Sequence, residues 1–273
     1  MRGARPERAL DVVVRAALRP DRGARVLVAC SGGPDSVALA ALLERLSRTT
    51  RTELVLGHVN HGRRAGADQD ECVVLAVAAR LGLPVAIARP TIARDDEQTL
   101  RSARYAALED LARAAGCGAV VTAHTAEDQT ETVLLALFRG TGLTGLGGMR
   151  MRRPLAAGIE LVRPLLRVTH GELATELRRS GLPYARDPTN ADRRYRRNAL
   201  RETLEHLRGD FPHLDRAVAR CAAIAADEAD GVPAAAERRT IRHRLRAGGR
   251  AQGVGFRQVE ELRRSGAGDE SAP

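Results

Sequence analysis

The sequence predicts an α/β protein with a doubly wound parallel sheet, followed by a smaller and mostly helical C-terminal region. Three observations predict this architecture. The first 150 residues alternate short apolar runs with longer helical segments, the pattern of a parallel sheet covered on both faces. A tight glycine turn, Ser31–Ser36, joins the first apolar run to a helix. From Arg139 onward this alternation stops, and glycine, proline and arginine become frequent.

Short apolar runs between turn residues are the expected strands, and the longer segments between them are the expected helices. The strands are Arg25–Cys30, Glu53–Val59, Val85–Ala88 and Ala119–Ala123. The helices are Asp11–Leu18, Val37–Ser47, Ala67–Leu81, Glu97–Ala115 and Asp128–Arg139. Ligands of such sheets bind at the carboxyl ends of the strands, so the loops that follow the strands are the expected site.

The second half of the chain is less regular. A glycine-dense loop, 139–148, precedes a segment that is expected to hold a short hairpin, 149–166. Thr169 and Glu172 have the spacing of a capping box at the start of a helix that ends at Ser180. A basic helix, Arg193–Leu207, and further helix over Pro212–Arg246, interrupted near Gly231, complete the pattern. We therefore expect a catalytic domain over 1–208, a helical region over 209–247 and a disordered tail over 248–273.

Composition suggests an anionic partner. The 273 residues carry a net charge of +10, and all 44 basic residues are arginine because the chain contains no lysine. Excess arginine favours binding to a nucleic acid, with compositional bias as the alternative. An aromatic content of 2% without tryptophan argues against aromatic stacking as the main mode of base recognition. No apolar stretch approaches the ~20 residues of a membrane span, and no signal segment is evident, so we expect a cytoplasmic protein without a membrane partner.

The turn Ser31-Gly32-Gly33-Pro34-Asp35-Ser36 predicts a phosphate site. A strand, a glycine turn and a helix N-terminus together place backbone N–H groups around an anion. The serines add hydroxyl donors, whereas Asp35 would repel phosphate unless Mg²⁺ or a positive substrate group lies between them. The turn has neither the lysine of a Walker A loop nor the GxGxxG spacing, and an ordinary glycine-rich turn is the alternative.

Polar residues also mark two other strand ends. His58, Asn60 and His61 would face the glycine turn, which favours contact with a nucleotide over zinc binding or a plain surface loop. Asp128 and Glu131 are three residues apart, on one face of the first turn of a helix. These carboxylates either complement the helix dipole or receive a cation, which could be Mg²⁺ or a substrate ammonium.

Arginines and cysteines supply two further observations. Arg101 and Arg104 share a helix face, which is either a solvated basic stripe or a set of ligands for phosphate or carboxylate. Cysteine occurs four times, at Cys30, Cys72, Cys117 and Cys221, and no two of these form a CxxC pair. Neither a zinc ribbon nor an iron–sulfur ligand set is therefore visible.

Taken in order, these motifs resemble those of the tRNA(Ile)-lysidine synthases, members of the N-type PP-loop ATP pyrophosphatase superfamily with a Rossmann-like sheet. The resemblance covers about residues 25–205 and suggests a short form of the family. Arg63 and Leu100 depart from the family pattern, at positions that look peripheral. The motifs are Ser31–Ser36, His58–Arg64, Leu100–Tyr105, His124–Thr132, Arg139–Met149, Arg163–Leu166, Asp187–Asn190 and Arg197-Asn198.

The resemblance implies a ligase that forms lysidine in two steps. Its substrates would be ATP with Mg²⁺, free L-lysine and the isoleucine tRNA with a CAU anticodon. The first step adenylates C2 of the wobble cytidine, and the lysine ε-amine then displaces AMP. The oligomeric state stays open, with a homodimer as one possibility.

The resemblance also implies roles for individual residues. The catalytic residues would be Asp35, His124 and Asp128, with Asp35 also placing Mg²⁺ or the lysine amine. ATP would be bound by Ser31, Gly32, Gly33, Pro34, Asp35, Ser36, His58, Asn60 and His61. Lysine would be bound by Arg104, Asp128 and Glu131. The charge of the basic helix, independently of the resemblance, predicts contacts to tRNA phosphates from Arg193, Arg194, Arg196, Arg197 and Arg201.

Two alternative functions remain. A tRNA-thiolating PP-loop enzyme would share the phosphate loop, but such enzymes generally use cysteines to carry sulfur, and the missing CxxC pair argues against one. A non-catalytic RNA-binding protein on the same scaffold would not need an intact Ser31–Ser36 turn. Labelled lysine, ATP and the isoleucine tRNA would distinguish these functions.

Overall fold

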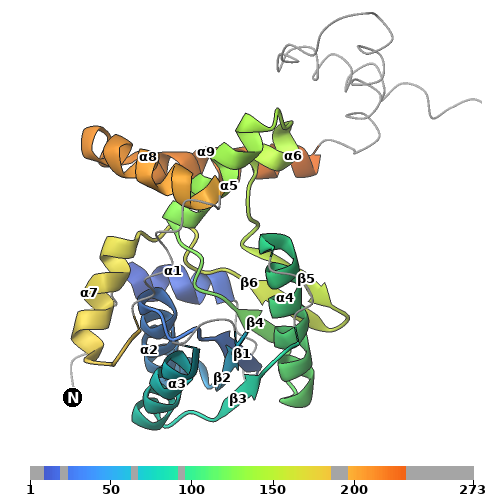
Figure 1. Ribbon diagram of the computed structural model, residues 1–273, viewed down its shortest axis with the longest axis vertical. Helices are drawn as coiled ribbons and strands as arrows, with labels where there is room; N and C mark the ends of the chain where they lie inside the picture. Colours follow the sequence, from blue (N-terminus) through green and yellow to red (C-terminus); the bar gives the residue numbers. More distant parts are fainter. Residues whose placement is uncertain (1–8, 19–23, 63–66, 92–95, 186–195, 232–273) are drawn as a thin grey trace, which may run out of the picture.

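Six strands form a single sheet in the computed structural model of the chain (Figure 1). The structure describes residues 9–18, 24–62, 67–91, 96–185 and 196–231. The strand order is β3-β2-β1-β4-β6-β5, and every neighbouring pair is parallel except the β5–β6 hairpin. The strands are β1 (Arg25–Ala29), β2 (Glu53–Val59), β3 (Val85–Ala88), β4 (Ala119–Val121), β5 (Arg152–Ala156) and β6 (Ile159–Val162).

Both faces of the sheet are buried, which confirms the predicted doubly wound architecture. Val26 and Val28 of β1 belong to a core that α1, α2, α3 and α7 complete on one face. Leu27, between them, points to the opposite face and packs in a second core with Leu108 of α4 and Leu161 of β6. The helices are α1 (Ala9–Leu18), α2 (Pro34–Thr50), α3 (Ala67–Leu81), α4 (Glu97–Ala114) and α7 (His170–Ser180).

A group of helices stands above the carboxyl edge of the sheet, at the top of Figure 1. It consists of α5 (Ala126–Phe138), α6 (Leu143–Leu146), α8 (Arg196–Asp210) and α9 (Leu214–Gly231). The helices α6, α8 and α9 all contact α5, and α6 also packs against α9. The short helix α6 lies within the segment that we expected to be an irregular glycine loop. A side chain at Gly147 would meet the backbone of Ala226 at 3.1 Å, so glycine permits the close approach of α6 to α9.

Element boundaries differ from the predictions by a few residues. α2 begins at Pro34 instead of Val37, because proline suits the first helical position, so Asp35 and Ser36 lie in the first turn. α5 begins at Ala126 instead of Asp128, because Thr125 and Asp128 form a capping box. The expected hairpin and the Thr169–Glu172 capping box are both confirmed.

The expected boundary between residues 208 and 209 falls inside α8. The predicted helix beyond Gly231 and the predicted tail, 248–273, lie outside the described residues.

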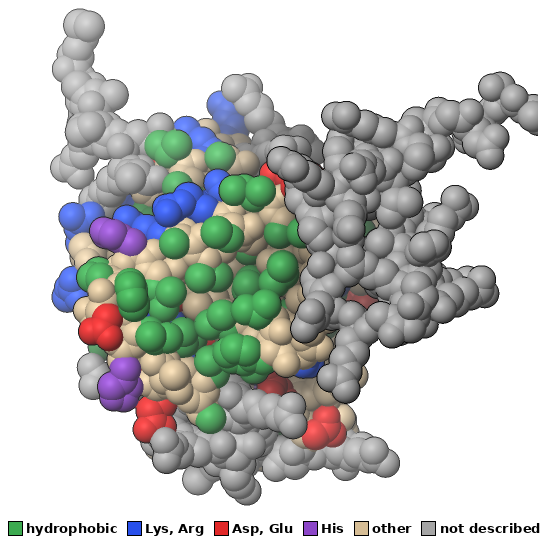
Figure 2. All heavy atoms as spheres, turned by 90° about the horizontal axis from the view of Figure 1, so that it is seen from above, with side chains coloured by type: hydrophobic (Ala, Val, Ile, Leu, Met, Phe, Trp, Pro, Cys, Tyr) green, Lys and Arg blue, Asp and Glu red, His purple; other side chains and the backbone are tan. Residues whose placement is uncertain are grey.

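Figure 2 looks onto the face above the sheet, where hydrophobic side chains gather beside a row of arginines. None of the described helices has the length and apolarity that crossing a membrane requires. Large exposed hydrophobic residues of α5, α8, α9 and their ends are Leu137, Phe138, Leu207, Phe211 and Ile224.

Candidate functional site

The phosphate loop is held in shape by its two serines. Ser36 Oγ donates to the Gly33 carbonyl oxygen at 2.9 Å and lies 3.2 Å from both Ser31 Oγ and Ser31 N. Gly33 is the N-cap of α2 and offers no side chain, so the N-terminal N–H groups of this helix receive no side-chain cap. Such N–H groups bind anions readily, and the helix dipole favours negative charge there.

Both the backbone conformation and the surrounding atoms favour glycine at position 32. Its φ of +86° lies in the left-handed region, and a Cβ at this position would meet the Asp70 carbonyl oxygen at 3.1 Å. The loop therefore packs against the start of α3.

Asp35 forms an ion pair with His170, a residue that the sequence interpretation did not single out. The distance from His170 Nδ1 to Asp35 Oδ2 is 3.0 Å, and His170 is the first residue of α7. Although burial disfavours the imidazolium, the hydrogen bond and charge of Asp35 raise the pKa of His170 to about 9, with Glu127 and Asp128 adding to this effect. His170 is therefore a cation at neutral pH.

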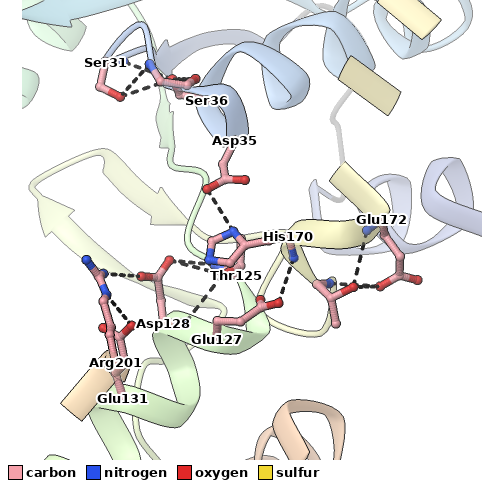
Figure 3. A network of polar contacts seen from close by, with 12 residues as sticks. Ser31, Asp35, Ser36, Thr125, Glu127, Asp128, Glu131, His170, Glu172 and Arg201 are labelled. Carbon is pink, nitrogen blue, oxygen red and sulfur yellow. Dashed lines mark hydrogen bonds and ion pairs between the residues drawn. The ribbon is translucent and has the colours of Figure 1, made fainter. Parts of the chain in front are cut away.

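Glu127 links the same histidine to α5. Its Oε1 accepts the backbone N–H of His170 at 2.9 Å, while its Oε2 is buried without a hydrogen-bond partner among the described residues. Figure 3 shows how Asp35, His170, Glu127 and the capping residues follow one another from the phosphate loop to α5 and α7. The network connects the phosphate loop to the helix that carries the predicted lysine ligands.

The two carboxylate oxygens of Asp128 make different contacts. Oδ2 accepts the backbone N–H of Thr125 at 3.0 Å in the capping box. Oδ1 faces Arg201 Nη2 at 3.6 Å. Glu131, which is 2% exposed, accepts from Arg201 Nε at 2.6 Å. The two carboxylates thus converge on one guanidinium, that of Arg201 (Figure 3).

Arg201 differs in position from what we expected. The sequence interpretation placed it on a basic helix for tRNA phosphates, but its guanidinium points from α8 into the carboxylate pair. Its partners Glu131 and Asp128 offset burial and raise the pKa of Arg201. Arg193 and Arg194 lie outside the described residues, and the side chains of Arg196 and Arg197 also lie outside the described part.

His124 follows β4 and is a neutral imidazole at physiological pH. Burial lowers the pKa of His124 to about 4; Asp128 opposes the shift, and Arg163, Arg101 and Arg104 add to it. Its Nδ1 lies 2.8 Å from Thr122 Oγ1. This histidine can exchange hydrogen bonds with a substrate, but it does not supply a positive charge.

Three polar residues at the end of β2 and just after it have different contacts. His58 is buried with Nδ1 2.9 Å from the Cys30 carbonyl oxygen, and its Nε2 has no hydrogen-bond partner in the part of the chain that is described. Asn60 donates to Glu71 Oε2 and accepts from Gly62 N, both at 2.9 Å, so it shapes the loop. The hydrogen bond from Asn60 lowers the pKa of Glu71 against the effect of burial, with help from Arg89. His61 is half-buried on the same loop.

The glycine-dense segment is clamped by Gln129, which sequence reasoning also missed. Gln129 Oε1 accepts from Met149 N at 2.8 Å, and its Nε2 donates to the Met149 carbonyl oxygen at 3.1 Å. Gly148 has a φ of +58°, and a Cβ there would lie 2.8 Å from the Gln129 amide. Its place in the motif His124–Thr132 was the available signal, although no charge chemistry pointed to it.

Asp35 fits the requirements of Mg²⁺. This ion is bound through one or two carboxylates together with substrate phosphates and water, and Asp35 stands in the first turn of α2 beside the phosphate loop. Within the described ranges, no group of three or more His, Cys, Asp or Glu residues could hold a metal by itself. The single carboxylate of Asp35 could therefore hold a metal whose other ligands are substrate phosphates and water.

The phosphate loop at the end of the first strand of a doubly wound sheet defines a PP-loop protein, and the PP-loop domain family matches residues 7–207. The tRNA(Ile)-lysidine synthase of a Synechococcus strain is 38% identical over 221 residues, covering 81% of this chain and 68% of the relative. The chain belongs to the tRNA(Ile)-lysidine synthase family.

Other similarities agree with this assignment. The tRNA(Ile)-lysidine synthase of Ralstonia nicotianae is 40% identical over 210 residues, covering 75% of this chain and 45% of the relative. The chain thus spans between about half and two thirds of the length of these curated relatives. Among solved structures, the U34-tRNA thiolase NcsA from Methanococcus maripaludis has a TM-score of 0.68 at 17% identity, over 80% of this chain and 78% of that chain. That similarity shows a shared fold.

Proposed function

We propose that this protein joins L-lysine to C2 of the wobble cytidine in the isoleucine tRNA with a CAU anticodon. ATP is cleaved to AMP and pyrophosphate, and the product is lysidine. The relatives at 38–40% identity carry the name of this activity. The observation that carries the proposal is a carboxylate pair, Asp128 and Glu131, that already holds a cation above the carboxyl edge of the sheet that bears the phosphate loop.

The reaction needs two displacements. In the first, the cytidine O2 attacks the α-phosphorus of ATP, an O–P bond forms and pyrophosphate leaves. In the second, the lysine ε-amine attacks C2, a C–N bond forms, and the C2–O bond breaks to release AMP while the amine loses a proton. A site for this reaction must hold the triphosphate, a free ammonium group and an RNA nucleotide together.

The phosphate loop supplies the ATP end. Ser31, Gly32, Gly33 and Ser36 would hold the phosphates through hydroxyl groups and the N-terminal N–H groups of α2, with Pro34 starting the helix. His58 would donate or accept through its buried Nε2, whereas Asn60 and His61 would act by shaping their loop. Mg²⁺ held by Asp35 and the phosphates would neutralise the charge of the leaving pyrophosphate.

The α5 carboxylates supply the lysine end. Asp128 and Glu131 would bind the positively charged end of lysine, and Arg104 would bind its carboxylate. Loss of hydration among the neighbouring protein atoms lowers the pKa of the Arg104 guanidinium; Arg101 adds to this shift and Tyr105 opposes it. His124 would act as a neutral hydrogen-bonding group beside the reacting base, because its pKa of about 4 leaves it uncharged.

Residues 1–208 are proposed as the catalytic unit, with residues 209–247 as a helical region that contacts RNA. Arg193, Arg194, Arg196 and Arg197 remain proposed phosphate contacts, whereas Arg201 is reassigned to the carboxylate pair because of its two ion pairs. A cytoplasmic location and a homodimer also remain proposals.

The test is incorporation of labelled lysine into an unmodified isoleucine tRNA transcript with a CAU anticodon. We expect incorporation that requires ATP, with AMP released in equal amount, and none into a transcript whose wobble cytidine is changed to uridine. Absence of incorporation with both cognate RNA and ATP present would overturn the proposal.

A tRNA thiolase is the alternative that the NcsA fold similarity raises. All four cysteines lie in the described ranges as free thiols, with Cys30 and Cys117 buried and Cys72 and Cys221 exposed on α3 and α9. Burial raises the pKa of the Cys30 thiol, which disfavours the reactive thiolate. Sulfur transfer without lysine incorporation in the same assay would reverse the ranking.

A further inference from the structure

Three arginines surround the side chain of Tyr105 on α4. The guanidinium carbons of Arg101 and Arg153 each lie 5.2 Å from the centre of the ring. Arg163, which follows β6, donates from Nη2 to the phenol oxygen at 3.3 Å, and Arg101 donates to the same oxygen at 3.4 Å. We call Arg101, Arg153, Arg163 and Tyr105 the arginine–tyrosine cluster.

The cluster contains more positive charge than its surroundings neutralise. No acidic residue in the described ranges forms an ion pair with Arg101, Arg153 or Arg163. Arg163 is 2% exposed, and its Nε has no hydrogen-bond partner among the described residues. Buried charges are normally paired, so this arrangement calls for an anion from outside the described chain.

The pKa shifts of Tyr105 and Arg163 agree with an excess of positive charge in the cluster. Although burial disfavours the phenolate, the arginines Arg163, Arg101 and Arg153 lower the pKa of Tyr105. Burial and the cations Arg153 and Arg101 lower the pKa of Arg163, whereas Tyr105 opposes that change. The cluster thus repels cations and would be stabilised by a bound anion.

The topology places the cluster beside the proposed active site. β6 is parallel to β4, with Val162 opposite Val121, so Arg163 and the segment that leads to His124 leave adjacent strand ends. β1, which carries the phosphate loop, is the neighbour of β4 on its other side. With strands about 4.8 Å apart, the end of β6 that leads to Arg163 lies roughly 10 Å from the end of β1 that leads to the phosphate loop.

We propose that the arginine–tyrosine cluster is a binding subsite for a phosphodiester group of the RNA substrate. It would hold the backbone next to the nucleotide whose base enters the site, in addition to any contacts made by α8. The inference rests on the proposed function, because it takes the RNA as the substrate that the site must orient.

Two other anions fit the cluster less well. The pyrophosphate of ATP would stay at the N-terminus of α2, on the far side of β4 from Arg163. The lysine carboxylate already has Arg104 as its proposed partner, and two of the three guanidinium groups of the cluster belong to side chains that are only half-buried. A half-buried group of several arginines suits a polyanion that approaches from solvent, because arginine pairs with phosphate through several N–H groups at once.

The experiment measures binding of the tRNA transcript to the full chain over a range of KCl concentrations, without ATP or lysine. The variant Arg153→Gln, on β5, is compared with Arg113→Gln, an equal change of charge near the C-terminal end of α4, where Arg113 pairs with Glu109 at 2.9 Å. For Arg153→Gln we expect the slope of log K against log salt to fall by about 1, and affinity near physiological salt to fall by about tenfold. Arg113→Gln should keep the wild-type slope, and Arg153→Lys should restore most of it.

Other outcomes would overturn the inference. One is a wild-type salt slope in both Arg153→Gln and Arg101→Gln. Another is a raised KM for lysine, or a weaker inhibition by pyrophosphate, with RNA binding intact, since these would assign the cluster to a different anion. A chain that binds RNA through Arg153 yet forms no lysidine would contradict the proposed function and leave the subsite standing. The reverse result, lysidine formation with an unchanged slope, would remove the subsite alone.

Discussion

Glu131 and Arg201 form an ion pair, with 2.6 Å between Glu131 Oε1 and Arg201 Nε, at the point where the proposed lysine substrate would place a positive charge. Asp128 faces the same guanidinium. Lysine and Arg201 would therefore compete for the two carboxylates.

The first prediction concerns this competition. In Arg201→Gln the carboxylates lose their internal partner, so lysine should bind the enzyme, without RNA or ATP, about tenfold more tightly, since a competing contact of about 1.4 kcal/mol has been removed. The free energy of unfolding should fall by about 1–3 kcal/mol, because Glu131 is left buried without this partner. Calorimetric titration with lysine and urea unfolding measure the two quantities.

Arg208→Gln is the matched control. Arg208 also lies on α8 and pairs with a carboxylate, Asp215, at 2.8 Å. This variant should lose stability without any gain in lysine affinity. Lysine affinity that is unchanged or weaker in Arg201→Gln would mean that Arg201 helps to bind the substrate instead of competing with it.

The second prediction separates the two roles of Asp128. Asp128→Asn keeps an oxygen for the Thr125 N–H but removes the charge, so the KM for lysine should rise about 10- to 100-fold, the effect of losing roughly 1.5–3 kcal/mol from a charged hydrogen bond. The KM for ATP should not change. Steady-state lysidine formation at varied lysine measures the effect.

Thr125→Ala is the control for this second prediction, because it weakens the same cap without touching the charge. It should cost about 1 kcal/mol of stability and leave the KM for lysine nearly unchanged. If both variants altered the KM for lysine equally, the role of Asp128 would be to cap α5 and nothing more.

Local sequence signals predicted the elements of the fold and the loops that carry the site. The glycine turn at Ser31–Ser36, the alternating apolar runs and the capping box at Thr169 are each determined by neighbours in the chain, so they could be read directly. The doubly wound architecture followed from these signals, because a parallel sheet needs helices on both faces.

Contacts between distant segments were not predictable in the same way. The pairing of Asp35 with His170 joins the start of α2 to the start of α7, which are brought together only by the packing of these helices. Arg201 read as one more arginine of a basic helix, because nothing in its own segment reveals that α8 directs it at Asp128 and Glu131. Arg163 begins the motif Arg163–Leu166, yet its hydrogen-bond partner Tyr105 lies 58 positions earlier in the chain.

The third prediction tests the phosphate loop through its left-handed glycine. Gly32→Ala should lower the free energy of unfolding by about 1–2 kcal/mol because φ is +86°, and its new Cβ should also push the loop away from the Asp70 carbonyl oxygen. We expect the KM for ATP to rise at least tenfold. Gly82→Ala is the control: its φ is +67°, with no atom within 4 Å of the added Cβ, so it should lose stability alone. An unchanged KM for ATP in Gly32→Ala would argue against phosphate binding by this loop.

The last prediction uses the ion pair between Asp35 and His170. The folded structure raises the pKa of His170 from 6.5 to about 9, so the pair contributes its full stability below pH 6.5 and loses it as pH rises through 9. His170 is 50% exposed, which screens the pair, and we expect a contribution of about 1 kcal/mol. In the presence of a chelator, His170→Gln should therefore unfold at lower urea than the wild type at pH 6 and at nearly the same urea at pH 9.5.

The control is His206→Gln, which removes a histidine that bonds the Glu202 carbonyl oxygen on α8. The stability difference between this variant and the wild type should not disappear between pH 6 and pH 9.5 in the same way. A stability difference for His170→Gln that stayed constant from pH 6 to pH 9.5 would show that the imidazole acts through packing, without the charge that the pair requires.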